Sequence, residues 1–173
     1  MKLSGSYTFD APRARVWAFL IDPQKLSKCI PGVKSLETIG EHEYAGEIDV
    51  GVAAVKGVYK GKVKLEDLRA PAHYRMVVDG KGKQGFVKGS GTLDLEDEGG
   101  KTVLKYAGDA QIGGPLASVG QRMIEGVAKQ MTTQFFTAME AEVAAKEGEV
   151  VRQGVTINFW RRFLKWLRGL FGQ

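Results

Sequence analysis

Residues 58–65 read VYKGKVKL, a stretch in which lysines alternate with apolar or small residues. Successive side chains of a β-strand point to opposite faces of the sheet, so this period of two indicates a strand with one buried and one wet face. The segment TLDL at 92–95 alternates in the same way, and turn signals such as Ala70-Pro71 separate further segments of this kind. From about 33 to 113 the sequence therefore predicts an antiparallel meander.

Shorter elements precede the meander. Residues 2–9 predict a first strand, and two short helices are expected to follow it. The Pro31-Gly32 pair is expected to end this region. Asp10 is predicted to cap the first helix, with Pro12 in its first turn, where a missing N–H group costs nothing. The second helix is expected at roughly 23–29. The meander is thus preceded by a strand and two helices.

A single long helix is predicted after the Gly-Gly-Pro turn, running to about Lys146, with its apolar residues in one broad arc. The architecture expected is α+β, a curved antiparallel sheet around a long C-terminal helix. Gly120 and Gly126, beside two methionines, favour an apolar cavity under this helix. A stripe of apolar residues on one helix face is, however, also typical of a filled core. The predicted lining is Val50, Val52, Val55, Tyr59, Met76, Val78, Phe86, Val119, Met123, Val127, Met131 and Phe135; Val87 could face the same side.

The end of the chain has a different pattern. Residues 147–155 predict a linker, and 156–173 predict an amphipathic helix whose apolar and basic residues occupy opposite halves. The sixteen residues at 157–172, in which the two halves are sorted, span about 24 Å as a helix, less than the ~30 Å hydrocarbon core, so the helix is expected to lie flat on anionic lipid. A core-packing helix and a peptide that docks in a partner's groove are the alternatives. The predicted membrane contacts are Phe159, Trp160, Arg161, Arg162, Phe163, Lys165, Trp166, Leu167, Arg168, Leu170 and Phe171.

The distribution of charge argues against nucleic-acid binding. The net charge is +5, but residues 1–151 hold equal numbers of basic and acidic residues, and the excess lies in the final segment. Cys29 is the single cysteine, which excludes an intramolecular disulfide and a zinc site built from several thiolates. Because the sequence also contains no secretory signal or apolar run of membrane-spanning length, we expect a cytoplasmic protein that is peripheral on the inner face of the cytoplasmic membrane.

The motifs of catalysis and cofactor binding give no support to an enzyme. Residues 80–85, GKGKQG, match G-x-G-x-x-G, but strand-like residues follow where the dinucleotide fingerprint requires a helix, so a hairpin turn is predicted. His42 and His73 have no metal-ligand spacing and are expected at the surface. We therefore predict no catalytic residue and no metal site.

Three stretches carry a resemblance to a known family. FDAP at 9–12, CIPGV at 29–33 and GFVKGSG at 85–91 resemble the carbon monoxide dehydrogenase G-subunit (CoxG) family of the START/Bet v 1-like (SRPBCC) superfamily. The resemblance covers roughly 1–145 and implies a helix-grip ligand-binding domain, here bounded at 1–146. Members of that family are similar to helper proteins of molybdenum-containing carbon monoxide dehydrogenases, implicated in bringing the enzyme to the membrane, and are not themselves catalysts.

The expected function combines this resemblance with the two apolar features of the sequence. A cavity and a membrane-lying helix together favour a non-catalytic carrier for a quinone of menaquinone or ubiquinone type. Its expected partners are the dehydrogenase, a molybdenum hydroxylase, and anionic membrane lipid. Two alternatives stay open: a helix-grip enzyme of the cyclase or aromatase kind, and a pure interaction adaptor with a filled core.

Overall fold

The computed structural model describes residues 1–144, so the predicted linker and amphipathic helix lie outside the described residues. Within this range seven antiparallel strands form one sheet in the order β1-β7-β6-β5-β4-β3-β2. The predicted meander is confirmed, since β2 to β7 follow one another as neighbours and β1 pairs with β7. The strands are β1 (Lys2–Phe9), β2 (Val33–Gly40), β3 (Glu43–Val50), β4 (Gly57–Arg69), β5 (His73–Gly82), β6 (Gly85–Glu98) and β7 (Lys101–Gly113).

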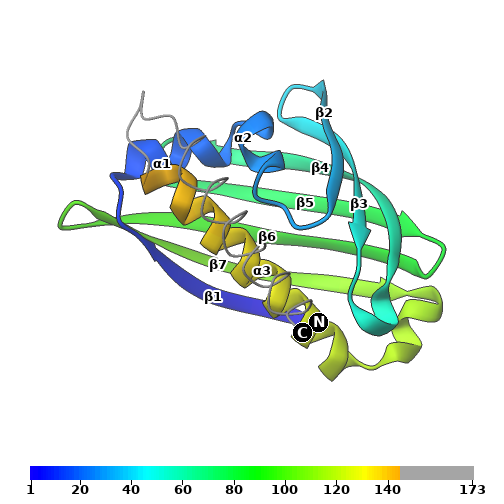
Figure 1. Cartoon of the computed structure of the whole chain (residues 1–173). Coiled ribbons are helices and arrows are strands. Elements are labelled where there is room, and N and C mark those ends of the chain that lie inside the picture. Colours follow the sequence, from blue (N-terminus) through cyan, green and yellow to red (C-terminus); the bar gives the residue numbers. More distant parts are fainter. Residues whose placement is uncertain (145–173) are drawn as a thin grey trace, which may run out of the picture.

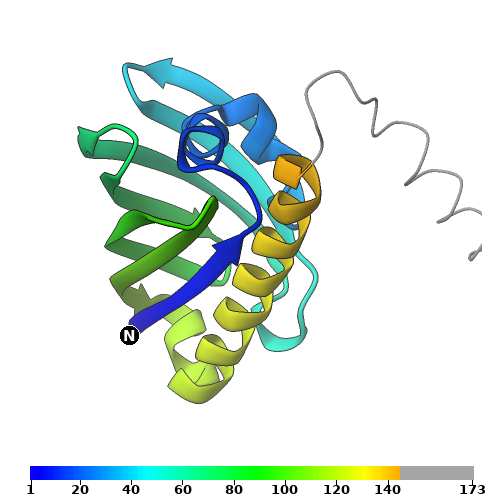
Figure 2. The same ribbon diagram turned by 90° about the vertical axis from the view of Figure 1, so that its left-hand side faces the viewer.

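The helices gather on one side of this sheet. The long helix α3 (Gln121–Ala144) runs diagonally across the sheet and ends beside α1 (Arg13–Leu20), and α2 (Pro23–Ser27) lies next to α1 (Figure 1). Seen from the side, the sheet curves toward α3 (Figure 2). Two 3-10 helices, η1 (Ala53–Val55) and η2 (Gly114–Val119), contact each other. The predicted sheet around a long C-terminal helix is therefore confirmed.

The start of α1 differs from the prediction. Its N-cap residue is Pro12, no side chain caps it, and the backbone N–H of Asp10 instead donates to Glu140 Oε1 at 3.4 Å. The prediction that Asp10 caps this helix was wrong because the helix begins only at Arg13, beyond the reach of the Asp10 side chain. Asp22 is the residue that does act as a cap, since its carboxylate accepts the backbone N–H groups that open α2.

The long helix also begins later than predicted. Residues 114–119 form the 3-10 helix η2, and α3 starts only after Gly120, whose φ and ψ are 100° and 139°. This backbone conformation is open to glycine and strained for other residues, so Gly120 separates the two helices and does not lie in a helix interior. The end predicted near Lys146 lies outside the described residues, which end at Ala144 within α3.

The core is divided into two clusters. The larger one joins β1, α1, β7 and the carboxyl-terminal half of α3, and its fully buried members include Phe9, Val16, Leu104 and Met139. The smaller cluster lies at the η1 and η2 end of the molecule and consists of Val50, Val55 and Leu116, with half-buried residues around them. Residues of both clusters, such as Tyr74 and Phe136 of the larger one and Val87 and Met131 of the smaller one, border a cavity between the sheet and α3.

Candidate ligand-binding cavity

A cavity of about 490 Å³ lies between α3 and the inner face of the sheet. This volume falls within the range of roughly 300–1,000 Å³ that is usual for small-molecule sites. The strands of the sheet, the region of α1 and α2, and α3 all contribute to its walls. Its apolar and aromatic lining consists of Leu3, Leu20, Leu26, Ile30, Pro31, Leu36, Tyr44, Val63, Leu65, Tyr74, Met76, Val78, Val87, Leu93, Tyr106, Ala107, Ala110, Met131, Phe135 and Phe136. The alternative of a filled core therefore does not describe this molecule.

Glycines on the inner face of the sheet explain why the cavity is hollow. Gly91 lies opposite Met76 on β5 and opposite Gly108 on β7, and both glycines line the cavity. A Cβ atom added at Gly91 would lie 2.9 Å from the Ala107 carbonyl oxygen and 3.2 Å from the Gly108 Cα atom. The strands approach one another too closely here for side chains, so the sheet bends and nothing fills the space above it.

Tyrosines supply the main polar groups of this apolar cavity. Tyr44 and Tyr74 are both buried, and the Tyr44 hydroxyl lies 3.5 Å from the carbonyl oxygen of Ile21. Burial raises the pKa of Tyr74, with a smaller contribution from Tyr44, and burial followed by the Asp22 charge raises the pKa of Tyr44. Both phenols therefore stay protonated and neutral, and each can donate a hydrogen bond.

The lining of the cavity carries little charge. Asp109 is the charged residue among the described lining, and its side chain is 66% exposed and lies 3.4 Å from the amino group of Met1. Thr132 on α3 turns its hydroxyl back onto the helix, where it donates to the Ala128 carbonyl at 2.7 Å. A ligand enclosed here would meet apolar walls and phenol hydroxyls.

The structure places four of the twelve predicted lining residues at the cavity and six in the smaller cluster. Met76, Val78, Met131 and Phe135 line the cavity. The other six pack at the η1 and η2 end. The sequence pattern predicts which face of a helix or strand is apolar, but not which end of that face borders a cavity. These six are Val50, Val52, Val55, Tyr59, Val119 and Val127.

The remaining two predicted lining residues, Phe86 and Met123, lie elsewhere. The ring of Phe86 is 5.9 Å from Lys88 Nζ, and its neighbour Val87 lines the cavity, because successive residues of β6 face opposite sides of the sheet. Met123 is 49% exposed. It lies in the first turn of α3, directly after the break at Gly120, where the helix has not yet reached the packed part of the sheet.

Several lining residues were missed by the sequence-based prediction. Tyr74 shares one face of β5 with Met76 and Val78, a period of two that is visible in the sequence and could have identified it. Ile30 and Pro31 line the cavity from the connection between α2 and β2. Both belong to the CIPGV stretch on which the family resemblance was based, so that stretch forms part of the cavity wall.

The described residues offer neither a reactive thiol nor a cluster of metal ligands. Burial, with a smaller contribution from Glu142, raises the pKa of the Cys29 thiol to about 11, which keeps it protonated and unreactive at neutral pH. Within residues 1–144 no group of three or more His, Cys, Asp or Glu side chains is arranged to hold a metal ion.

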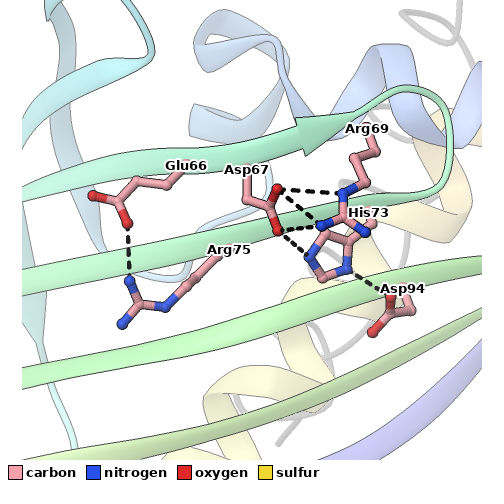
Figure 3. Close-up of polar contacts among 6 residues, drawn as sticks. All are labelled: Glu66, Asp67, Arg69, His73, Arg75 and Asp94. Carbon is pink, nitrogen blue, oxygen red and sulfur yellow. Dashed lines mark hydrogen bonds and ion pairs between the residues drawn. The ribbon is translucent and has the colours of Figure 1, made fainter.

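His73 lies in a polar cluster near the turn that joins β4 to β5 (Figure 3). Its Nδ1 is 2.7 Å from Asp94 Oδ1, and its Nε2 is 3.3 Å from Asp67 Oδ2. Arg69 also contacts Asp67, at 3.1 Å. Both ring nitrogens of His73 are therefore engaged by carboxylates from β4 and β6, and the cluster ties three adjacent strands together.

The fold defines a class of protein. A START superfamily protein from Mycobacterium smegmatis superposes with a TM-score of 0.66 at 11% identity, over 82% of this chain and 96% of that one. Ara h 8.0201 superposes with a TM-score of 0.65 at 16% identity, over 84% of this chain and 99% of that one. The protein thus has the helix-grip fold that these START/Bet v 1-like proteins share.

Sequence comparison narrows this class to one family. The family model for the carbon monoxide dehydrogenase G-subunit (CoxG) matches residues 5–144, and the chain belongs to this family. A conserved protein from Geobacillus kaustophilus, whose crystal structure is known, is 41% identical to this chain in sequence. The two structures superpose with a TM-score of 0.81, over 83% of this chain and 95% of that one. No curated protein matches the sequence. Among the helices that the structure describes, none has the length and apolar character needed to cross a membrane.

Proposed function

We propose that this protein is a non-catalytic carrier of an apolar ligand of the quinone type, which connects a molybdenum-containing carbon monoxide dehydrogenase with the cytoplasmic membrane. The observation that carries the proposal is the cavity of about 490 Å³, with its apolar walls, in a member of the CoxG family. Apolar pockets with a few placed polar groups are the usual form of small-molecule sites. The family name supports the dehydrogenase as the partner.

The chemistry of the lining supports binding in preference to catalysis. General acid–base catalysis needs a side chain whose pKa lies near the working pH. Tyr44 and Tyr74 instead have pKa values that burial raises above the ordinary value of a phenol, which favours donors that keep their protons. Cys29, with its pKa near 11, is equally unsuited to act as a nucleophile.

A quinone fits the task that such a carrier would perform. The dehydrogenase is water-soluble, whereas the quinones of a respiratory chain are confined to lipid. A protein that shields a quinone in an apolar cavity and also binds the membrane would connect the two. The amphipathic pattern predicted at 156–173 supports the membrane contact, since its basic half would face anionic headgroups and its aromatic half would enter the interface.

The identity of the bound ligand is tested with protein purified from its native host. Organic extraction followed by mass spectrometry is expected to find one quinone or similar isoprenoid lipid per protein molecule. Added quinone analogues are expected to raise the melting temperature, because a ligand that binds only the folded state stabilises it. Finding neither a stoichiometric lipid nor a change in melting temperature would remove the carrier proposal.

The membrane contact is tested by co-sedimentation with vesicles. Full-length protein is expected to sediment with phosphatidylglycerol vesicles, less so at high salt, and not with phosphatidylcholine vesicles. The matched variants change residues 156–173 in one respect each: Arg161→Glu with Lys165→Glu reverses charge, and Trp160→Ala with Trp166→Ala removes aromatic surface. Both should lose binding, and sedimentation of all three proteins to the same extent would contradict the anchor.

The dehydrogenase contact is tested by reconstitution. Dehydrogenase, full-length protein and quinone-containing vesicles are combined, and quinone reduction by carbon monoxide is followed. We expect reduction to depend on the protein and to fall when the Trp160→Ala, Trp166→Ala double variant replaces it. Equal rates with and without the protein would contradict a role between the enzyme and the quinone pool.

A further inference from the structure

The hydroxyl of Tyr74 has no hydrogen-bond partner among residues 1–144, although the side chain as a whole is buried. The side chain lines the cavity, is 4% exposed, and packs edge-on against Trp17 with 5.8 Å between ring centroids. Two other tyrosine hydroxyls are engaged: Tyr59 donates to the Val55 carbonyl at 2.8 Å, and Tyr44 reaches the Ile21 carbonyl at 3.5 Å. Buried tyrosine hydroxyls usually find such a partner, so the free hydroxyl of Tyr74 calls for an explanation.

We propose that Tyr74 donates a hydrogen bond to a carbonyl oxygen of the bound ligand and thereby selects a neutral carbonyl head group. The proposal rests on the carrier function proposed above and adds the chemistry by which the cavity distinguishes its ligand. A donor that lines an apolar cavity and has no partner among residues 1–144 is satisfied when an acceptor arrives there. The ligand would give this hydroxyl a hydrogen-bond partner in apolar surroundings, which favours binding.

The protonation state of the tyrosine supports a donor role. Burial raises the pKa of Tyr74, and the neighbouring Tyr44 raises it further, because a phenolate is poorly solvated in an apolar site. The hydroxyl therefore keeps its proton over the physiological range. Tyr44 also lines the cavity, so a second phenol lies near the position where the head group would bind.

The charge of the lining restricts the head group to a neutral one. None of the described lining residues is a lysine, arginine or histidine, so a buried carboxylate would have no cationic partner here. The one charged lining residue, Asp109, is itself acidic. A free fatty acid would bury an uncompensated negative charge, which is strongly unfavourable, whereas a quinone ring is neutral and presents carbonyl oxygens as acceptors.

The test compares Tyr74→Phe with the matched control Tyr59→Phe in the full-length protein. Each change removes one hydroxyl, in the first case from the cavity and in the second from the smaller cluster, where Tyr59 packs. Three probes share a ten-carbon chain: decylubiquinone, decylbenzene and decanoic acid. We expect Tyr74→Phe to weaken decylubiquinone binding about three- to tenfold and to leave decylbenzene unchanged. Tyr59→Phe should change neither affinity.

In the absence of ligand, the two substitutions should affect the melting temperature differently. Tyr74→Phe removes a hydroxyl that has no partner among residues 1–144, so the melting temperature should stay the same or rise. Tyr59→Phe leaves the Val55 carbonyl without its donor and should lower the melting temperature. A fall for Tyr74→Phe as large as that for Tyr59→Phe would show a structural role for this hydroxyl and would overturn the proposal.

An infrared measurement on the unmodified protein tests the hydrogen bond without any variant. A hydrogen bond lowers the stretching frequency of the quinone carbonyl, so decylubiquinone bound to the unmodified protein should show one shifted carbonyl band. In Tyr74→Phe, if that variant folds, the shifted band should be absent. An unshifted band in the unmodified protein would overturn the proposal even if the variant failed to fold.

The binding outcomes separate this proposal from the carrier function. If the unmodified protein and Tyr74→Phe bind decylubiquinone equally well, the role of Tyr74 is wrong and the carrier function stands. Tighter binding of decanoic acid than of decylubiquinone overturns the neutral head group alone. If the unmodified protein binds neither decylubiquinone nor decylbenzene, both proposals fall together.

Discussion

The carboxyl-terminal half of α3 buries Phe136, Met139 and Val143, whereas none of the residues from Gln121 to Met131 is fully buried. Both halves belong to one helix and cross the same sheet. The carboxyl-terminal half packs in the larger cluster with β1 and α1, the middle of the helix lines the cavity with Met131, Thr132, Phe135 and Phe136, and the amino-terminal half lies over the smaller cluster. A single helix can therefore provide stability at one end and border a hollow site in its middle. The packed end supplies the stability that an unfilled cavity forgoes.

The largest difference between the two halves is expected from shortening a methionine in each. Met139 is fully buried and Met123 is 49% exposed. Met139→Ala should lower the free energy of unfolding by about 2–5 kcal/mol, because it leaves a cavity in packed surroundings. Met123→Ala should change it by less than about 0.5 kcal/mol. Urea denaturation followed by circular dichroism measures both, and equal losses would refute the division of α3.

A methyl group on the floor of the cavity should have the next largest effect. Gly91→Ala would place its Cβ atom 2.9 Å from the Ala107 carbonyl oxygen, and we expect a loss of about 1–3 kcal/mol as the strands shift apart. Gly80→Ala is the control, because the nearest atom to its Cβ would be the Val87 carbonyl oxygen at 3.9 Å. That variant should be neutral or slightly more stable. Chemical denaturation of both variants decides whether close strand approach shapes the cavity floor.

Two threonines give a smaller contrast between the packed and hollow regions. Thr102 is fully buried and donates to the Ala11 carbonyl at 2.7 Å, so Thr102→Val should cost about 1–2 kcal/mol. Thr132, at the cavity, donates to the Ala128 carbonyl, which a helical N–H group also engages. Thr132→Val should therefore change the free energy of unfolding by only a few tenths of a kcal/mol. A larger loss for Thr132→Val than for Thr102→Val would contradict the comparison.

The last effect is confined to high pH and involves Cys29 in the packed region. Its pKa is raised to about 11 in the folded protein from a model-compound value of 9.0, chiefly by burial. Between these values the unfolded chain releases a proton that the folded one keeps, so stability should fall as the pH rises from about 9 to 11. Denaturation at several pH values should show a shallower fall in Cys29→Ala. Identical slopes in the two proteins would show that this thiol does not titrate differently on folding.

Local pattern was sufficient for much of the fold. The strands at 33–113 followed from a period of two, and the long helix followed from its apolar arc. Pattern was insufficient where a single residue decides the outcome. Phe86 and Val87 are both apolar, and only the hydrogen-bonded register shows that Val87 faces the cavity. The break at Gly120 depends on a backbone angle that a helical wheel does not contain.

The cavity was harder to predict than the elements that enclose it. Met76 and Val78 could be assigned to the inner face of β5, but Val50 and Val55 have the same character and pack in the smaller cluster. The membrane contacts predicted at 156–173 lie outside the described residues and stay a prediction. Tyr74 was overlooked although it shares one face of β5 with Met76 and Val78, which were predicted to line the cavity.

The sequence by itself determined the order of the elements, the antiparallel meander, the long helix and the family, because these depend on periodicity and on motifs written along the chain. Only the tertiary structure decided where the space lies and which side chains border it. A cavity is the volume that is left when curved elements pack, so it depends on strand spacing, helix position and register together. No one segment contains that information, which is why the place of Tyr74 at the cavity became visible only in the folded molecule.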